Sequence, residues 1–175
     1  MMRKHREDMI NLDLDCFLFR NDDLDYEEYY YLENHGYEYG EFVPIGKNCQ
    51  EEFLIKKNTR ESLGHTFLVH NIKQELEKCG VEVKTYITVK PDLIFTTKKN
   101  KIFVVEVETG KQFRRRKQRI KNNFEKVKQK YSNVVIVVTT TKVKRHYQRL
   151  LPNNTIMVRT DIQKWIASLK KNKEL

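Results

Sequence analysis

Residues 89–111 read VKPDLIFTTKKNKIFVVEVETGK, and this stretch decides the fold. Its two apolar runs predict β-strands over residues 92–97 and 102–108, joined by a lysine- and asparagine-rich turn. Paired positions in an antiparallel hairpin share a constant sum, so a turn within residues 98–101 places Asp92 opposite a residue between 105 and 108. A second turn at Thr109-Gly110 follows, and Lys111 comes directly after it.

Three carboxylates gather at the open end of this predicted hairpin. Side chains alternate between faces along a strand, so Glu106 and Glu108 share one face and Asp92 lies beside them. Which of the two glutamates Asp92 faces depends on the register. Carboxylates this close repel one another unless a cation neutralises them, and oxygen ligands suit hard ions such as Mg²⁺ or Mn²⁺. The simpler alternative is that the acids are solvated charges on a polar rim of the sheet.

Charge is divided unevenly along the chain. The 175 residues carry a formal net charge of +10. Residues 1–59 hold seven Lys or Arg against fourteen Asp or Glu, a balance of −7, whereas residues 60–175 hold twenty-seven against ten, a balance of +17. This predicts an acidic, tyrosine-rich N-terminal extension over 1–59 and a basic domain over 60–175. A basic domain attracts polyanions, so nucleic acid is the expected partner, although a lysine-rich proteome would give the same balance.

Several classes of protein are disfavoured by the sequence. Three widely spaced cysteines form no CxxC pair, which disfavours a disulfide framework or a zinc site. The apolar runs are too short to cross a bilayer and the charged N-terminus has no secretory signal, so a cytoplasmic protein without a membrane partner is expected. The motifs of NTP-binding loops, dinucleotide-binding folds, α/β-hydrolases and HExxH metalloproteases are also missing.

Hydrophobic periodicity predicts an α/β fold. A helix over 60–80, a strand over 81–89 and the hairpin precede a strongly basic helix over 112–131 and an apolar strand over 134–140. The order is therefore helix, three-strand meander, helix, strand. The other predicted elements are strands within 9–19 and over 42–45, 53–55 and 155–158, and a helix or hairpin over 21–40. A helix over 142–151 and a final helix capped by Asp161, with a frayed tail behind it, complete the set.

One pattern within residues 89–111 resembles the signature of the PD-(D/E)XK nuclease superfamily. It consists of Pro91-Asp92, a thirteen-residue spacer, and Glu106-Val107-Glu108 after an apolar run. The resemblance covers roughly residues 60–158, and it implies a restriction-endonuclease-like core with the element order predicted above. Members of that superfamily typically cleave phosphodiester bonds with one or two divalent ions. The chain departs from the signature at Glu108, which stands where most members have a lysine and where some branches have a second glutamate.

The resemblance assigns roles to individual residues. It implies that Asp92 and Glu106 bind Mg²⁺ or Mn²⁺, that the Val107 carbonyl is a further ligand, and that Glu108 binds a metal or acts on the attacking water. Lys111 is the first candidate to replace the missing lysine, with Lys121 and Lys126 as weaker ones. The first helix often supplies another acid in this superfamily. The candidates there are Glu61 and His65, although an ordinary polar role for His65 is equally consistent with the sequence.

The basic helix is the predicted nucleic-acid contact. We expect its early cations to position DNA through phosphate contacts, which carry no sequence information, although a merely solvated helix face is the alternative. These residues are Arg114, Arg115, Arg116, Lys117 and Arg119.

The sequence therefore predicts a divalent-metal-dependent DNA endonuclease. One alternative is a strand-specific, relaxase-like nicking enzyme of a mobile element, with water or a tyrosine of residues 29–31 as nucleophile. Another is a nucleic-acid-binding module of the same fold that has lost catalysis, as the missing lysine would suggest. RNA is the alternative substrate, and cleavage of both DNA strands would favour a homodimer.

Overall fold

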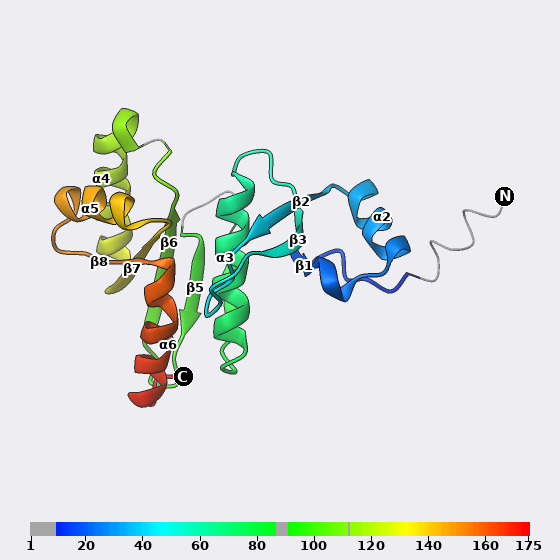
Figure 1. Ribbon diagram of the computed structural model, residues 1–175. Helices are drawn as coiled ribbons and strands as arrows, with labels where there is room; N and C mark the ends of the chain where they lie inside the picture. The colour runs from blue at the N-terminus through cyan, green and yellow to red at the C-terminus, as the bar shows by residue number, and fades with distance from the viewer. Residues whose placement is uncertain (1–9, 87–90, 112) are drawn as a thin grey trace. The chain divides into compact units, whose positions relative to one another are not determined.

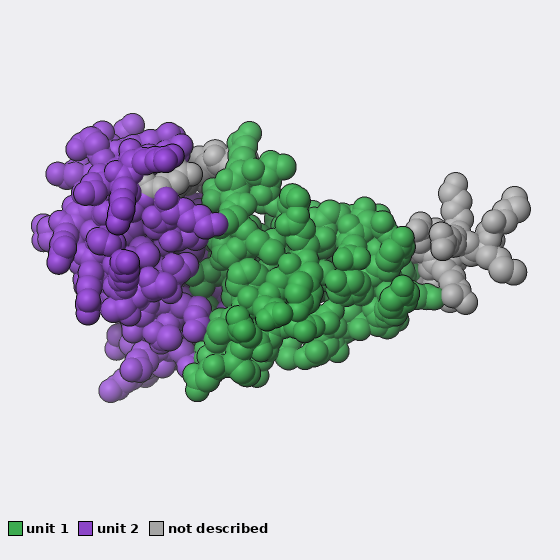
Figure 2. Space-filling view, turned by 45° about the horizontal axis from the view of Figure 1, so that its top comes forward, with its two compact units in different colours: residues 1–70 green, residues 71–175 purple. Residues whose placement is uncertain are grey.

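The computed structural model describes residues 10–86, 91–111 and 113–175. The chain is a mixed α/β protein that divides into two compact units, residues 1–70 (unit 1) and residues 71–175 (unit 2), shown in different colours in Figure 2. The unit boundary lies inside helix α3 (Leu63–Glu77), whereas the sequence placed the domain boundary between residues 59 and 60.

Unit 1 is built on a three-stranded antiparallel sheet with its third strand in the middle. Side chains of that strand alternate: Phe53 and Ile55 pack with Phe67 of α3, whereas Leu54 packs with Leu32 on the opposite face. The sheet is thus covered on both faces and has two small apolar cores. The elements are β1 (Leu18–Arg20), η1 (Asn21–Asp23), α2 (Tyr26–Asn34), β2 (Tyr37–Phe42) and β3 (Glu51–Lys56).

Local hydrogen bonds explain where these elements begin. Asp25 caps α2 by accepting hydrogen bonds from the backbone N–H groups of Glu27 and Glu28, and the Glu28 side chain accepts one from the Asp25 N–H. The predicted strand within residues 9–19 is largely wrong, since only Leu18 and the residue after it belong to β1. Asp13 forms a turn there instead, with its carboxylate accepting from the backbone N–H two residues on. The strand predicted over 42–45 is wrong as well, because β2 ends at Phe42.

Unit 2 contains a five-stranded sheet in the order β4-β5-β6-β7-β8. Strand β5 pairs antiparallel with both β4 and β6, whereas β6, β7 and β8 are parallel to one another, so β6 has an antiparallel neighbour on one side and a parallel neighbour on the other. The predicted order of helix, three strands, helix and strand is confirmed, although part of the strand expected over 81–89 lies outside the described residues. The elements are β4 (Val83–Thr85), β5 (Leu93–Thr96), β6 (Ile102–Glu108), α4 (Phe113–Lys130), β7 (Asn133–Val138), α5 (Thr141–Leu150), β8 (Thr155–Val158), η2 (Arg159–Asp161) and α6 (Ile162–Lys171).

Helices α4 and α5 cover one face of this sheet (Figure 1). Phe113, Ile120 and Phe124 form the buried stripe of α4, and they pack with Tyr147 of α5 over alternate residues of β6 and β7 such as Val104. On the other face, Trp165 of α6 contacts Phe95 and Phe103, with ring centroids 6.1 Å apart in both pairs. No helix within the described ranges is long and apolar enough to cross a membrane.

Two predictions about the C-terminal region are wrong. Asp161 precedes α6 but does not cap it. Its carboxylate accepts hydrogen bonds from the Val158 N–H and from Lys144 Nζ, both of which lie before it in the chain. The tail is not frayed either, because Glu174 is buried and accepts a hydrogen bond from Lys101 Nζ in the β5–β6 turn at 2.6 Å.

Candidate active site

The β5–β6 hairpin places Asp92 next to Glu106. Leu93 pairs with Val105, and the same antiparallel register continued by one residue puts Asp92 opposite Glu106, within the range predicted from the sequence. Residues opposite one another share a face of the sheet, and this face is the one that Val104 presents to α4 and α5. The two acids predicted to bind a metal are therefore brought together.

Both carboxylates are buried. Glu106 has no exposed surface and Asp92 retains 8%. Asp92 Oδ2 accepts a hydrogen bond from the Val107 backbone N–H at 2.7 Å, which fixes the orientation of the carboxylate across the hairpin. Burying a charged carboxylate is costly unless partners or a cation compensate it, so this pair is unlike the solvated rim that was the simpler alternative.

This donor set fits Mg²⁺ or Mn²⁺. Mg²⁺ is commonly held by only one or two carboxylates together with water and substrate phosphates, and Asp92 and Glu106 supply two hard oxygen donors on one face. No group of three or more His, Cys, Asp or Glu side chains suited to a metal ion is found in the part of the chain that the structure describes. An ion at this position would therefore depend on the two carboxylates, water and substrate, with the Val107 carbonyl as the further ligand that the sequence predicted.

Glu108 has a different environment from Glu106. Its Oε2 accepts a hydrogen bond from the Tyr147 hydroxyl of α5 at 2.9 Å. Burial, and after it the negative charge of Glu108, raises the pKa of Tyr147, so the phenol stays protonated and keeps donating at ordinary pH. One oxygen of Glu108 is thus directed to α5, and its role as a metal ligand or in activating water stays a prediction.

The turn after β6 forms an open pocket of about 590 Å³ lined by one glycine and basic residues. Gly110 adopts φ +77°, a conformation that favours glycine, and a Cβ added there would lie 2.9 Å from Val143 Cγ2 of α5. Its carbonyl accepts a hydrogen bond from the Phe113 N–H at the start of α4. Glycine therefore lets the turn pack closely on α5. The pocket is lined by Gly110, Lys111, Arg114, Arg115 and Arg116.

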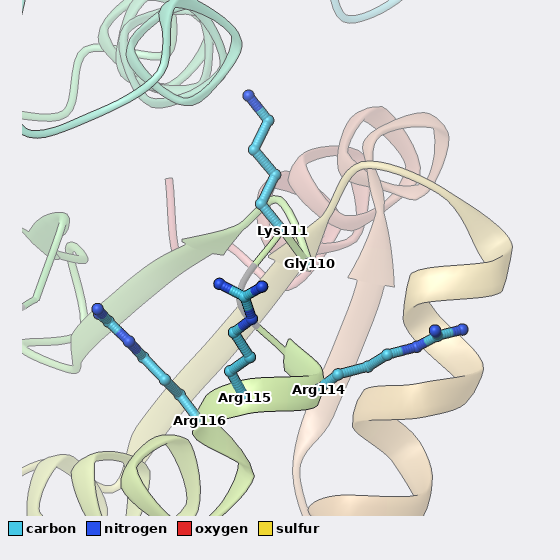
Figure 3. Close-up of a pocket in the computed structure, with 5 residues that line it drawn as sticks. All are labelled: Gly110, Lys111, Arg114, Arg115 and Arg116. Carbon is cyan, nitrogen blue, oxygen red and sulfur yellow. The ribbon is translucent and has the colours of Figure 1, made fainter.

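The four cations of the pocket point in different directions. Figure 3 shows the Arg115 guanidinium directed toward the turn, whereas Lys111 points away from Arg115 and Arg114 points toward α5. Arg116 has non-helical dihedral angles (φ −130°, ψ 21°), so α4 is kinked at this residue. In a straight helix successive residues are about 100° apart around the axis, and the kink changes the directions in which Arg115 and Arg116 point.

The other predicted cations of α4 lie outside this pocket. Lys117 Nζ lies 5.7 Å from the centroid of the Phe113 ring, a distance at which a cation is attracted by the aromatic face. Arg119, Lys121 and Lys126 are exposed on the helix surface. They can contribute to a basic surface, but they do not line the pocket at the end of β6.

The first-helix candidates pair with each other in unit 1. His65 Nδ1 lies 3.6 Å from Glu61 Oε2, and the two residues are four apart in the sequence. Asp92, Glu106 and Lys111 belong to unit 2, so a contribution of Glu61 or His65 to their site stays a prediction.

Two features of the site were not predicted. Tyr147 lies 39 residues beyond Glu108, and periodicity marks it as a helix residue without indicating its partner. The kink at Arg116 could not be predicted, because α4 contains no proline or glycine that would indicate it. The turn at Thr109-Gly110, in contrast, was visible in the sequence from its glycine.

Comparison of the chain with protein-family models, with curated proteins and with solved structures finds no match.

Proposed function

We propose that the chain is a divalent-metal-dependent nuclease with a restriction-endonuclease-like core, acting on DNA. The observation that carries the proposal is the pair of buried carboxylates, Asp92 and Glu106, on a hairpin whose second strand ends at a basic pocket. Phosphodiester hydrolysis needs ligands for a cation and contacts for phosphate, and this hairpin supplies candidates for both. The Pro91-Asp92 and Glu106-Val107-Glu108 pattern supports the same class.

In this proposal each residue of the hairpin has one task. Asp92 and Glu106 hold Mg²⁺ or Mn²⁺, and the Val107 N–H keeps Asp92 oriented toward its partner strand. The bound ion supplies polarisation of the phosphate and a more acidic water. Lys111, which reaches out from the turn after β6, takes the electrostatic role of the missing lysine at the phosphate.

A nucleic-acid-binding module without catalysis is the second candidate. The position of the family lysine is occupied by Glu108, whose carboxylate accepts a hydrogen bond from Tyr147, so that position supplies no cation to the substrate. The basic surface of α4 would serve binding equally well. The relaxase-like alternative, with a tyrosine of residues 29–31 as nucleophile, rests on the sequence alone.

The test is incubation of the full chain with supercoiled plasmid in Mg²⁺, in Mn²⁺ and in EDTA. We expect nicking or linearisation with either metal and none in EDTA. Asp92→Asn and Glu106→Gln remove the negative charge of each side chain and preserve its shape. Each substitution should lower cleavage by at least about a hundredfold. DNA binding should be kept or tightened, because a charge that repels the phosphates is lost. Glu82→Gln is the matched control, because Glu82 is an exposed acid of the same unit.

The variants must be compared at equal folding. Circular dichroism and the fluorescence of Trp165, the single tryptophan, report whether unit 2 is intact. Full cleavage by Asp92→Asn would refute the site. Absence of cleavage by the wild type, together with salt-sensitive DNA binding, would favour the binding module.

A further inference from the structure

We propose that the pocket after β6 binds a phosphate monoester, and that the nucleic acid this protein acts on carries a terminal phosphate held there. The inference rests on the proposed function, because it names the kind of strand end that the same site would receive. It concerns the pocket lined by Gly110, Lys111, Arg114, Arg115 and Arg116.

The first argument is charge. All four side chains of the lining are cationic, and no acidic residue is among the described residues that line the pocket. Among them, the Arg115 guanidinium is directed toward the turn that carries Lys111 (Figure 3).

The second argument is the match between this charge and the ligand. An internal phosphodiester carries one negative charge, whereas a phosphate monoester carries about −1.5 to −2 near pH 7 and presents three strongly accepting oxygens. Arginine guanidinium groups bind such oxygens through paired hydrogen bonds. The four cations that line the pocket are more than one phosphodiester neutralises, and they suit a monoester.

The third argument is size and place. A volume of about 590 Å³ lies within the range of pockets that hold small molecules, so the pocket is large enough for a terminal phosphate. Gly110 begins the pocket two residues after Glu108, the last residue of the strand that carries Glu106. A strand end anchored here would lie close to the carboxylate strand.

The fourth argument is that the pocket is held in shape. The packing of the Gly110 turn against Val143 and the hydrogen bond from the Phe113 N–H to the Gly110 carbonyl fix the turn. The kink at Arg116 then sets the directions of the neighbouring arginines. These contacts fix the backbone positions from which the exposed side chains of Lys111 and Arg115 reach a ligand.

The test compares fluorescent oligonucleotides of one sequence that end in a 5′-phosphate, a 3′-phosphate or hydroxyl groups. Binding is measured by anisotropy at one salt concentration in EDTA, so that cleavage does not interfere. We expect the wild type to bind one phosphate-ended strand about tenfold more tightly than the hydroxyl-ended strand, as added charge-assisted hydrogen bonds would give. The two phosphorylated strands show which end the pocket receives, and inorganic phosphate should reduce the preference.

Variants separate the pocket from the general basic surface. Replacing both Arg115 and Arg116 by glutamine should abolish the preference for the phosphate-ended strand. Arg119→Gln is the control, because Arg119 is an exposed arginine of α4 outside the pocket, and it should weaken all three strands equally. Equal binding of all three strands by the wild type, or a preference that survives the double substitution, would overturn the proposal. If the wild type prefers a phosphate-ended strand but cleaves no plasmid in Mg²⁺ or Mn²⁺, the phosphate pocket is supported and the nuclease is rejected.

Discussion

Replacement of Gly110 by alanine tests whether the turn after β6 is held by its close approach to α5. Gly110 and Gly80 both have φ +77°, but a Cβ at Gly110 would lie 2.9 Å from Val143 Cγ2, whereas a Cβ at Gly80 meets nothing within 4 Å. Gly80→Ala is therefore a control for the backbone conformation alone. Both glycines belong to unit 2.

The expected magnitudes follow from these two environments. An alanine at positive φ costs about 1–2 kcal/mol, so Gly80→Ala should lower the free energy of unfolding by that amount. Gly110→Ala carries the same cost and adds overpacking of about 1–3 kcal/mol, for a total of roughly 2–5 kcal/mol. Combining Gly110→Ala with Val143→Ala removes the obstructing methyl groups. The double variant should therefore lose less stability than the sum of the two single variants.

Urea unfolding followed by Trp165 fluorescence is the suitable assay. Trp165 is the single tryptophan and contacts Phe95 and Phe103, so its signal reports on unit 2 even if the two units unfold separately. Equal losses for Gly110→Ala and Gly80→Ala would refute the reasoning, because the contact with Val143 would then have no energetic consequence. Additive losses in the double variant would lead to the same conclusion.

Two further substitutions test contacts that involve α5. Tyr147→Phe removes the hydroxyl that donates to Glu108, and it should lower the free energy of unfolding by about 1–2 kcal/mol in the same urea assay. Hydrogen bonds to charged groups are strong, but water can reach the half-buried Glu108 and compensates part of the loss. An unchanged unfolding midpoint would contradict this expectation. The hydrogen bonds from Lys144 and the Val158 N–H lower the pKa of Asp161. The ionised carboxylate therefore stabilises the folded state above the unfolded pKa of about 3.9, and this stabilisation is lost as the pH falls through the folded pKa. Asp161→Asn should therefore be less stable than the wild type at pH 7, with a difference that shrinks below about pH 4 in unfolding measured against pH; a constant difference would contradict the assignment.

Local patterns were sufficient to predict the central part of unit 2. The β5–β6 hairpin depends on residues within one stretch of sequence, and the pairing of Leu93 with Val105 agrees with the register expected from the turn. The basic helix was equally predictable, because Phe113, Ile120 and Phe124 mark its buried stripe at helical spacing. The position of Asp92 beside Glu106 follows from these local rules.

Contacts between distant residues could not be predicted in this way. The Asp161 carboxylate was expected to cap the helix that follows it, but Lys144 and the backbone before it compete for the same oxygen. Glu174 is held by Lys101, 73 residues away, so a polar C-terminal segment that resembles a frayed tail is fixed in place. Periodicity indicates which face of an element is buried, but it does not indicate which side chain it meets.

The mixed direction of the sheet has a consequence for the order of folding. Strand β6 pairs with β5 across a short turn, but it pairs with β7 only after the whole of α4 has been placed between them. Short loops close at a lower entropic cost, so we expect the hairpin to form first. Asp92 and Glu106 would then meet while this face is still hydrated. The cost of removing Glu106 from water would fall on the later docking of the helices and not on strand pairing.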